Sequence, residues 1–236
     1  MAVMAKTPGL GPVKSRLHPS LTAERATDLY RCFLLDRLDG VTALDGVEPV
    51  IAFTPPEGGP LLAAVAPPGF RLVAQRGRDL GERLSNLLSD LLQKGHHGAM
   101  AIDSDSPTLP MSYVADAAKQ LETDATDVVV GPCEDGGYYL IGLSRPCPAL
   151  FDGIPWSTDR VLGLTLDKAR QQRLRTHLLP RWFDVDTEPD LQRLWAEMMA
   201  AGRGPRRTFS FVKQLFREGG SSAHPVPEPP PRRRVS

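Results

Sequence analysis

Short apolar runs alternate with longer stretches of helical periodicity along most of this chain, and this rhythm limits the fold more than any other feature. The runs predict strands at residues 2–5, 49–53, 71–75, 98–102, 127–131, 138–143 and 182–185. The stretches between them predict helices at residues 26–44, 80–93, 111–121, 159–170 and 188–199. Strand, helix, strand at this spacing is typical of crossover units on a mostly parallel sheet. The sequence therefore predicts an α/β fold, a Rossmann-like three-layer α/β/α sandwich.

The chain is long enough for one full-sized domain with a substantial core. Of its 236 residues, we assign 1–205 to this domain and predict a short C-terminal helix over 206–218. Residues 219–236 read GGSSAHPVPEPPPRRRVS, which is rich in proline and poor in apolar side chains. Such a segment buries too little surface to offset its ordering entropy, so we predict a disordered tail.

Composition excludes several classes of protein. Apolar residues make up 41% and charged residues 24% of the chain, which is ordinary globular usage. No run approaches the roughly 18 apolar residues of a membrane-spanning helix. The three cysteines are odd in number and form no CxxC pair, which indicates a reducing, cytoplasmic setting rather than a disulfide framework.

The net charge is zero, which argues against a nucleic-acid partner, but the charges are unevenly placed. Residues 201–236 hold eight basic and two acidic side chains, so residues 1–200 carry 20 basic and 26 acidic ones. The acidic excess therefore belongs to the predicted domain. Some of these acidic residues lie in loops that follow predicted strands and are candidate metal ligands.

In an open parallel sheet, ligands bind in the loops that follow the strands. The loop after the first predicted strand contains Lys6, Gly11, Lys14 and Arg16. Glycine lets backbone N–H groups approach an anion, and the cations can neutralise phosphate oxygens. The loop matches neither a P-loop nor GxGxxG, so an ordinary solvated basic loop remains the alternative.

A second polar loop follows the third predicted strand and runs into a leucine-faced helix. Gln75 at the strand end can hydrogen-bond the edge of a base, and the helix N-terminus near Gly81 favours an anionic group. The alternative is a helix capped by Asp79 with a polar loop before it.

Two pairs of carboxylates follow strands that are far apart in the chain. Asp103 and Asp105 are separated by one residue, as are Asp184 and Asp186. Paired carboxylates suit a hard divalent cation that bridges to substrate phosphates, so we predict Mg²⁺ or Mn²⁺ bound by these four residues. The alternatives are an Asx-turn for the first pair and a capped helix start for the second.

Two further loops are candidates for the acceptor substrate. Asp135, Gly136 and Gly137 lie between two predicted strands, where bare glycine backbone could face a substrate, although a hairpin turn is the simpler explanation. The triplet of Trp156, Ser157 and Thr158 follows a proline and could close over a site or pack in the core.

Taken together, these loops resemble a known family. The strings are AKTPGLGPVKSRL, QRGRDLGERL, the D-S-P-x-L-P turn at Asp105, GPCEDGGYYLIGL, the WST at Trp156 and DVDTEPDL, and they span residues 5–191. In this order they resemble the GT-A-fold transferases known as radical-SAM/selenodomain-associated transferases, relatives of 2-phospholactate and molybdenum-cofactor guanylyltransferases. The resemblance supports Asp105 as a metal ligand. At Asp103 the family typically has Gly, so that assignment rests on chemistry alone.

The resemblance implies a metal-dependent nucleotide-binding transferase, and we favour nucleotidyl transfer from an NTP to a small phosphorylated acceptor. The alternatives are glycosyl transfer from a nucleotide-sugar and a non-catalytic nucleotide-binding protein. In the favoured reading Lys14, Arg16 and Asp105 are catalytic, and the sequence specifies no oligomeric state. Nucleotide binding is assigned to Lys6, Gly11, Lys14, Arg16, Gln75 and Gly81, and acceptor binding to Asp135, Gly136, Gly137, Trp156, Ser157 and Thr158.

Overall fold

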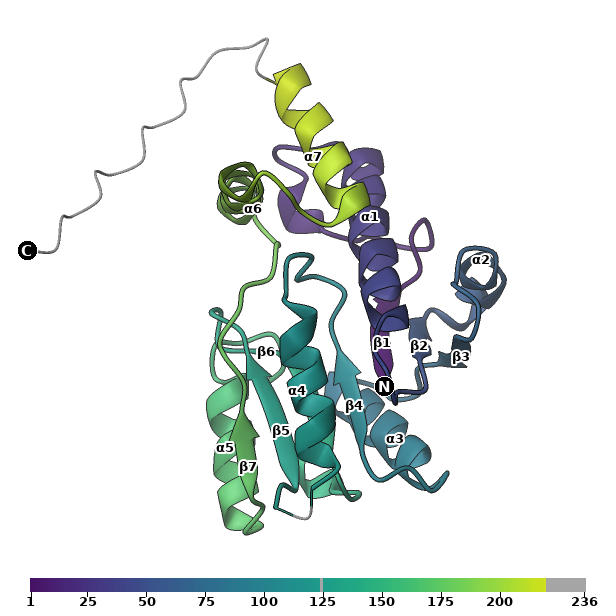
Figure 1. Cartoon of the computed structure of the whole chain (residues 1–236), viewed down its shortest axis with the longest axis vertical. Coiled ribbons are helices and arrows are strands. Elements are labelled where there is room, and N and C mark those ends of the chain that lie inside the picture. Colours follow the sequence, from purple (N-terminus) through teal and green to yellow (C-terminus); the bar gives the residue numbers. More distant parts are fainter. Residues whose placement is uncertain (124, 220–236) are drawn as a thin grey trace, which may run out of the picture.

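A computed structural model describes residues 1–123 and 125–219 as a seven-stranded sheet covered by helices (Figure 1). The strand order is β3-β2-β1-β4-β6-β5-β7. Every pairing is parallel except those of β6, which runs antiparallel to both β4 and β5. The predicted mostly parallel α/β fold is thus confirmed. None of the helices in the described ranges is both long enough and apolar enough to cross a bilayer.

The elements largely follow the predicted ranges. The strands are β1 Ala2–Lys6, β2 Val50–Thr54, β3 Arg71–Ala74, β4 Ala99–Ile102, β5 Val128–Pro132, β6 Tyr138–Leu143 and β7 Thr176–Leu178. The helices are α1 Ala23–Thr42, α2 Gly59–Ala63, α3 Leu80–Leu92, α4 Met111–Leu121, α5 Val161–Gln171, α6 Glu188–Ala201 and α7 Arg206–Gly219, with 3-10 turns η1 Ser15–Leu17, η2 Pro56–Gly58 and η3 Pro148–Leu150. The predicted tail lies outside the described residues from residue 220 onward.

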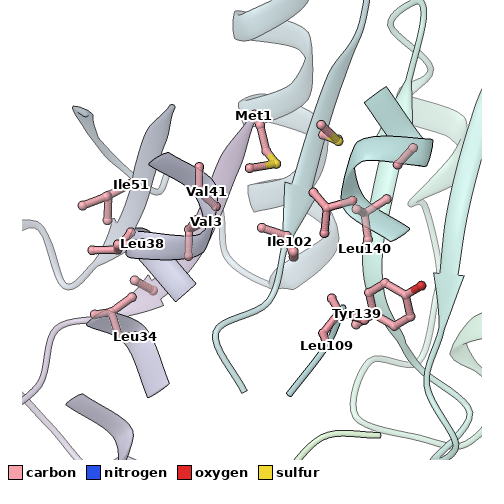
Figure 2. Close-up of a cluster of buried hydrophobic side chains, with 14 of the residues drawn as sticks. Met1, Val3, Leu34, Leu38, Val41, Ile51, Ile102, Leu109, Tyr139 and Leu140 are labelled. Carbon is pink, nitrogen blue, oxygen red and sulfur yellow. The ribbon is translucent and has the colours of Figure 1, made fainter. Parts of the chain in front are cut away.

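Two apolar clusters fix the helices to the two faces of the sheet. On one face, Leu34 and Leu38 of α1 pack with Val3 and Ile51 of the sheet, and Val114 of α4 belongs to the same cluster (Figure 2). On the other face, the leucines of α3 pack against alanines and valines of the sheet, together with part of α5. Because each cluster removes a continuous apolar surface from water, the three layers hold together.

A third apolar cluster joins the two C-terminal helices to the outer side of α1. Phe33 of α1, Leu17 of η1 and Leu194 of α6 are all fully buried in it. The ring of Trp195 stacks on Phe216 of α7 with centroids 5.2 Å apart. In Figure 1, α7 lies beside α1. The loop after β1 is therefore anchored through Leu17 to α1 and α6.

The prediction of a strand over residues 182–185 is wrong. Trp182 forms only an isolated parallel bridge with Cys133, and the last strand of the sheet is β7, six residues earlier. Asp127, directly before β5, accepts hydrogen bonds from the backbone N–H, Nε and Nη2 of Arg175 at 2.8, 3.0 and 3.1 Å. This contact favours pairing of the residues just after Arg175 with β5.

Candidate functional site

A cavity of about 340 Å³ opens where β1 and β4 end. Its wall includes the apolar residues Leu80 and Leu84 of α3 and the tyrosines Tyr30, Tyr138 and Tyr139. Six predicted site residues also line it: Lys6, Lys14, Gln75, Asp103, Asp105 and Asp186. The carboxyl edge of the sheet therefore brings together residues from the first, second and third predicted loops and from the last acidic pair.

Lys14 lies between the two acidic loops. Its Nζ is 2.5 Å from Asp105 Oδ1 and 2.8 Å from Asp186 Oδ1, and only 3% of its side chain is exposed. Burial acts to lower the pKa of Lys14, but the charges and hydrogen bonds of the two carboxylates outweigh burial and raise it. The ammonium group is therefore held in its charged form between two of the predicted metal ligands.

The two acidic loops are also joined through the backbone. The N–H of Val185 donates to the carbonyl oxygen of Asp105 at 3.0 Å. Thr187 caps α6 in a capping box with Asp190, whose Oδ2 accepts from the N–H of Thr187 at 2.8 Å. Burial acts to raise the pKa of Asp186, but the charge and hydrogen bond of Lys14 lower it. The carboxylate of Asp186 is thus held both in place and in its ionised form.

Asp103 is held by a buried arginine that the sequence analysis did not identify. The side chain of Arg37 is 2% exposed, and its Nη2 is 3.7 Å from Asp103 Oδ1 and 2.5 Å from the carbonyl oxygen of Ser106. Ser106 Oγ donates to Asp103 Oδ2 at 2.6 Å. Burial raises the pKa of Asp103 to about 6, although Arg37 acts in the opposite direction. These contacts fix the turn that carries Asp105.

Asp184 belongs to a second group of ligand atoms. An oxygen of Asp184, an oxygen of Asp135 and Sγ of Cys133 lie within 4.8 Å of one another. Burial raises the pKa of Asp184, and the charges of Asp186 and Asp135 raise it further. A cation near these carboxylates would relieve their repulsion. The described part of the chain thus contains an acidic group with the composition of a metal site.

Gln75 contributes only part of its amide to the cavity. Its Nε2 donates to the carbonyl oxygens of Ala52 and Ala5, at 2.8 and 3.4 Å. The donors are therefore bound to backbone carbonyls of β2 and β1, and Oε1 is the atom left to accept a hydrogen bond from a ligand.

The cations of the first loop lie in different environments. Arg16 is 72% exposed, and its Nη1 is 3.8 Å from Asp186 Oδ2. Gly11 is exposed, with a left-handed φ of 113°, and does not line the cavity. Lys6 is also exposed, and its backbone N–H donates to the hydroxyl of Tyr30 at 2.9 Å. Lys6 and Arg16 are thus the accessible cations of this loop.

The predicted acceptor residues lie beside the cavity rather than in its wall. A Cβ on Gly81 would lie 2.7 Å from Nε1 of Trp156, so the start of α3 packs directly on the indole. Trp156 also meets Tyr138 edge-on, with centroids 6.4 Å apart. Ser157 has a left-handed φ of 64°, and Thr158 donates to the carbonyl oxygen of Pro155. The triplet is thus a tight turn over α3 and β6.

The glycine directly after Asp135, Gly136, is required by the packing of the chain itself. A Cβ on Gly136, where φ is 91°, would lie 2.1 Å from the carbonyl oxygen of Asp159. The N–H of Gly137 donates to Asp135 Oδ1 at 2.8 Å. The bare backbone of Gly136 therefore packs against the segment before α5.

Sequence reasoning missed several residues of the site. Arg83 lines the cavity and lies within the string QRGRDLGERL, so this string could have predicted it as a site residue. Arg37 occupies a position on the apolar face of α1, between Leu34 and Leu38, where a charged side chain is unexpected. Tyr30 gave no signal, because its contacts with Lys6 and Ser104 depend on the fold.

The chain is similar to known proteins at two levels. The profile of a family described as "Uncharacterized protein conserved in bacteria (DUF2064)" matches residues 37–158. A Desulfovibrio desulfuricans G20 protein, provisionally assigned as a nucleotide-diphospho-sugar transferase, is 33% identical with a TM-score of 0.82, covering 92% of this chain and 96% of that one. The search of curated proteins found no match.

More distant structures share the fold alone. One is a CMP:2-keto-3-deoxy-manno-octonic acid synthetase complexed with CTP, 13% identical with a TM-score of 0.55 over 85% of this chain and 98% of that one. Another is 4-diphosphocytidyl-2C-methyl-D-erythritol synthase from Anaerococcus prevotii DSM 20548, 8% identical with a TM-score of 0.54 over 84% and 95%. The Desulfovibrio protein, which is similar over nearly all of the chain, has the fold of the nucleotide-diphospho-sugar transferases, and this chain shares that fold. Because the family profile also covers more than half of the chain, the chain belongs to the DUF2064 family.

Proposed function

We propose that this chain is a divalent-cation-dependent nucleotidyltransferase that transfers a nucleotidyl group from an NTP to a small phosphorylated acceptor and releases pyrophosphate. The observation that carries the proposal is the arrangement of Lys14 between Asp105 and Asp186 at the carboxyl edge of the sheet. This alternation of carboxylate, ammonium and carboxylate suits a nucleotide whose anionic phosphates bind together with a divalent cation. The names of two relatives that share the fold, a CMP-sugar synthetase with CTP and a diphosphocytidyl synthase, support this class.

The residues present fit a hard divalent cation. Asp105 and Asp186 keep 40% and 36% of their side chains exposed and line the cavity, and carboxylate oxygens are the donors that Mg²⁺ and Mn²⁺ prefer. We assign these two residues as ligands, with Asp184 and Asp103 beside them. When bound, the cation neutralises charge on the α-phosphate and the leaving pyrophosphate.

The other residues of the cavity would bind the nucleotide. Lys14, which lies between the two proposed cation ligands, would contact the phosphates beside the cation. Lys6, Arg16 and Arg83 would meet the remaining phosphate oxygens. Gln75 would accept a hydrogen bond from an amino group of the base, because its donors are already bound to Ala52 and Ala5. Asp135 and the turn at Trp156, which lie beside the cavity, would contact the acceptor.

The reaction requires little proton transfer from the protein. A phosphate oxygen of the acceptor would attack the α-phosphorus, and the bond from that phosphorus to the bridging oxygen of pyrophosphate would break. An ionised phosphate needs no general base, which is compatible with a cavity wall that contains no histidine among the described residues.

Glycosyl transfer from a nucleotide-sugar is the second candidate. The observation that favours it is the assignment of the 33% identical Desulfovibrio protein as a nucleotide-diphospho-sugar transferase. The same cavity and the same carboxylates would hold the diphosphate of such a donor.

One experiment separates the candidates. The protein is incubated with Mg²⁺ or Mn²⁺, a panel of NTPs and nucleotide-sugars, and phosphorylated small molecules as acceptors. Release of pyrophosphate supports nucleotidyl transfer, and release of a nucleoside diphosphate supports glycosyl transfer. Asp105→Asn should abolish either activity. Asp90→Asn is the matched control, because Asp90 of α3 is 43% exposed and is paired with Arg76 in the loop before the helix. If Asp105→Asn is as active as Asp90→Asn, the assignment of the site is wrong.

A further inference from the structure

A second, larger cavity lies on the other side of the Asp103–Ser106 turn from the candidate site. It has a volume of about 580 Å³ and lies between α1, the start of α4 and the connection from α6 to α7. Leu109, Met111 and Met198 give it an apolar lining. The proposed nucleotide chemistry uses none of these residues.

Three buried hydrogen-bonding groups in the wall of this cavity have no partner. They are Nε of Arg37, Oγ1 of Thr108 and Nε1 of Trp182. The guanidinium and indole groups are donors only, and a hydroxyl can also donate. A buried donor without an acceptor is unfavourable, and native proteins contain few. Among the described residues, three of the nine such atoms belong to the wall of this one cavity, where acceptor atoms of a ligand would satisfy them.

The charges of the wall favour an anion. Its two acidic residues are already paired, Asp36 with Arg207 and Glu197 with Arg193. Arg203 also lines the cavity, is exposed, and has no carboxylate within ion-pair distance among residues 1–123 and 125–219. Among the described residues, the wall thus offers unpartnered donors and the unpaired cation Arg203, while Arg37 already lies 3.7 Å from Asp103 Oδ1.

Met111 is the side chain that can admit such a ligand. Its Sδ lies 3.5 Å from Nη1 of Arg37, and a thioether is a weak acceptor on a flexible side chain. A carboxylate is a stronger acceptor for a guanidinium group, so it can replace the sulfur at Nη1, on the same guanidinium group as the unpartnered Nε. The unpartnered atoms carry almost no exposed surface, so a ligand reaches them only when side chains of the wall move.

We propose that this cavity is a second small-molecule site, which binds a small carboxylic acid with an apolar body through Arg37, Thr108, Trp182 and Arg203. The carboxylate accepts hydrogen bonds from the unpartnered donors, and the apolar body contacts Leu109 and Met198. The proposal concerns binding alone and stands whether or not the chain transfers nucleotidyl groups.

The test uses the tryptophan indole N–H signals in ¹H–¹⁵N spectra of the full chain. The chain has three tryptophans, and Trp182→Phe identifies the signal of Trp182. Benzoate, phenylacetate and hexanoate are titrated, with benzamide as the uncharged probe. We expect at least one carboxylate to shift the Trp182 signal in a saturable way while the Trp156 signal, beside the candidate site, stays unchanged. Benzamide should bind more weakly.

Two variants that keep the core intact sharpen the test. Thr108→Val removes only the hydroxyl, and Arg203→Gln removes an exposed cation. Each variant should bind the carboxylates about three- to tenfold more weakly, because it loses one hydrogen bond or one charge contact. The proposal is overturned if none of the three carboxylates shifts the Trp182 signal. It is also overturned if benzamide binds as tightly as benzoate, or if both variants bind as tightly as the unmodified chain.

Discussion

Lys14→Met removes the ammonium group that separates Asp105 from Asp186. The Nζ of Lys14 lies 5.7 Å from the ring centroid of Phe33. Methionine keeps the length and much of the apolar volume of the lysine side chain, so the packing of the loop on Phe33 changes little. The two carboxylates then face each other without the cation between them. The variant should therefore be less stable than the unmodified chain when divalent cations are absent.

The exposure of the three groups sets the size of this effect. Removing one partner of a fully buried ion pair costs about 3–5 kcal/mol, whereas exposed pairs contribute about 0–1 kcal/mol. Lys14 is 3% exposed, but Asp105 and Asp186 keep 40% and 36% of their surface. We therefore expect a loss of about 2 kcal/mol. In a chain of this size, this corresponds to a decrease in Tm of about 4–8 °C.

A divalent cation should reverse the loss. A cation at ten times its Kd stabilises the folded state by about 1.4 kcal/mol. In the variant the cation does not compete with the lysine for the carboxylates, so its Kd should be lower than in the unmodified chain. The assay is thermal unfolding followed by circular dichroism, in EDTA and in a series of Mg²⁺ or Mn²⁺ concentrations.

Lys6→Met is the matched control. Lys6 lines the same cavity but is exposed, and no carboxylate lies within ion-pair distance of it in the described parts of the chain. Its replacement should change stability by less than about 0.5 kcal/mol. An equal Tm of Lys14→Met and the unmodified chain in EDTA would refute the reasoning, as would equal stabilisation of both proteins by the cation.

Two further predictions concern stability outside the cavity. Arg175 and burial act in opposite directions on Asp127, and Arg175 dominates, lowering the pKa of Asp127 to about 2 from its ordinary 3.8. The stability that the ionised Asp127 contributes is thus present above about pH 4 and is lost as the pH falls through about 2. In urea unfolding, Asp127→Asn should therefore lower the free energy of unfolding by about 1–2 kcal/mol at pH 7 and by progressively less below pH 4. A difference that stays constant with pH would contradict this prediction. Gly81→Ala should destabilise the chain by about 1–3 kcal/mol and alter the fluorescence of Trp156, because the new Cβ would lie 2.7 Å from the indole. Gly163→Ala is the control, because Gly163 lies in α5 and no atom lies within 4 Å of its added Cβ; it should stabilise the chain by about 0.5–1 kcal/mol. If both variants are less stable than the unmodified chain, the Trp156 contact is not the cause.

The local elements of the fold follow from short-range patterns. The leucine stripe of α3 and its cap at Asp79, which accepts from the N–H of Glu82 at 2.9 Å, are determined by residues three and four apart. The same holds for the capping box at Thr187. Such features depend on hydrogen bonds and apolar faces within one turn, so they can be predicted from sequence without knowledge of the fold.

The strand after residue 175 shows where short-range patterns fail. The apolar run at 182–185 has the composition of a strand, yet the chain pairs with β5 at Thr176–Leu178. The pairing is accompanied by the contact between Asp127 and Arg175, which are 48 residues apart. Contacts between residues so far apart leave no trace in the local pattern.

The sequence by itself determined which residues of this protein lie at the carboxyl edge of the sheet, because strand ends follow from periodicity and the crossover rule. Asp103, Asp105, Gln75 and the first basic loop follow real strands and are placed there in this way, whereas Asp184 and Asp186 follow a predicted strand that does not form. Only the tertiary structure decided the partners of these side chains. Lys14 meets Asp186 across 172 positions, and Arg37 reaches the turn at Asp103 from the apolar face of α1. These distances depend on how separate elements pack together, and the packing is set by the sum of all core contacts rather than by any local string of residues.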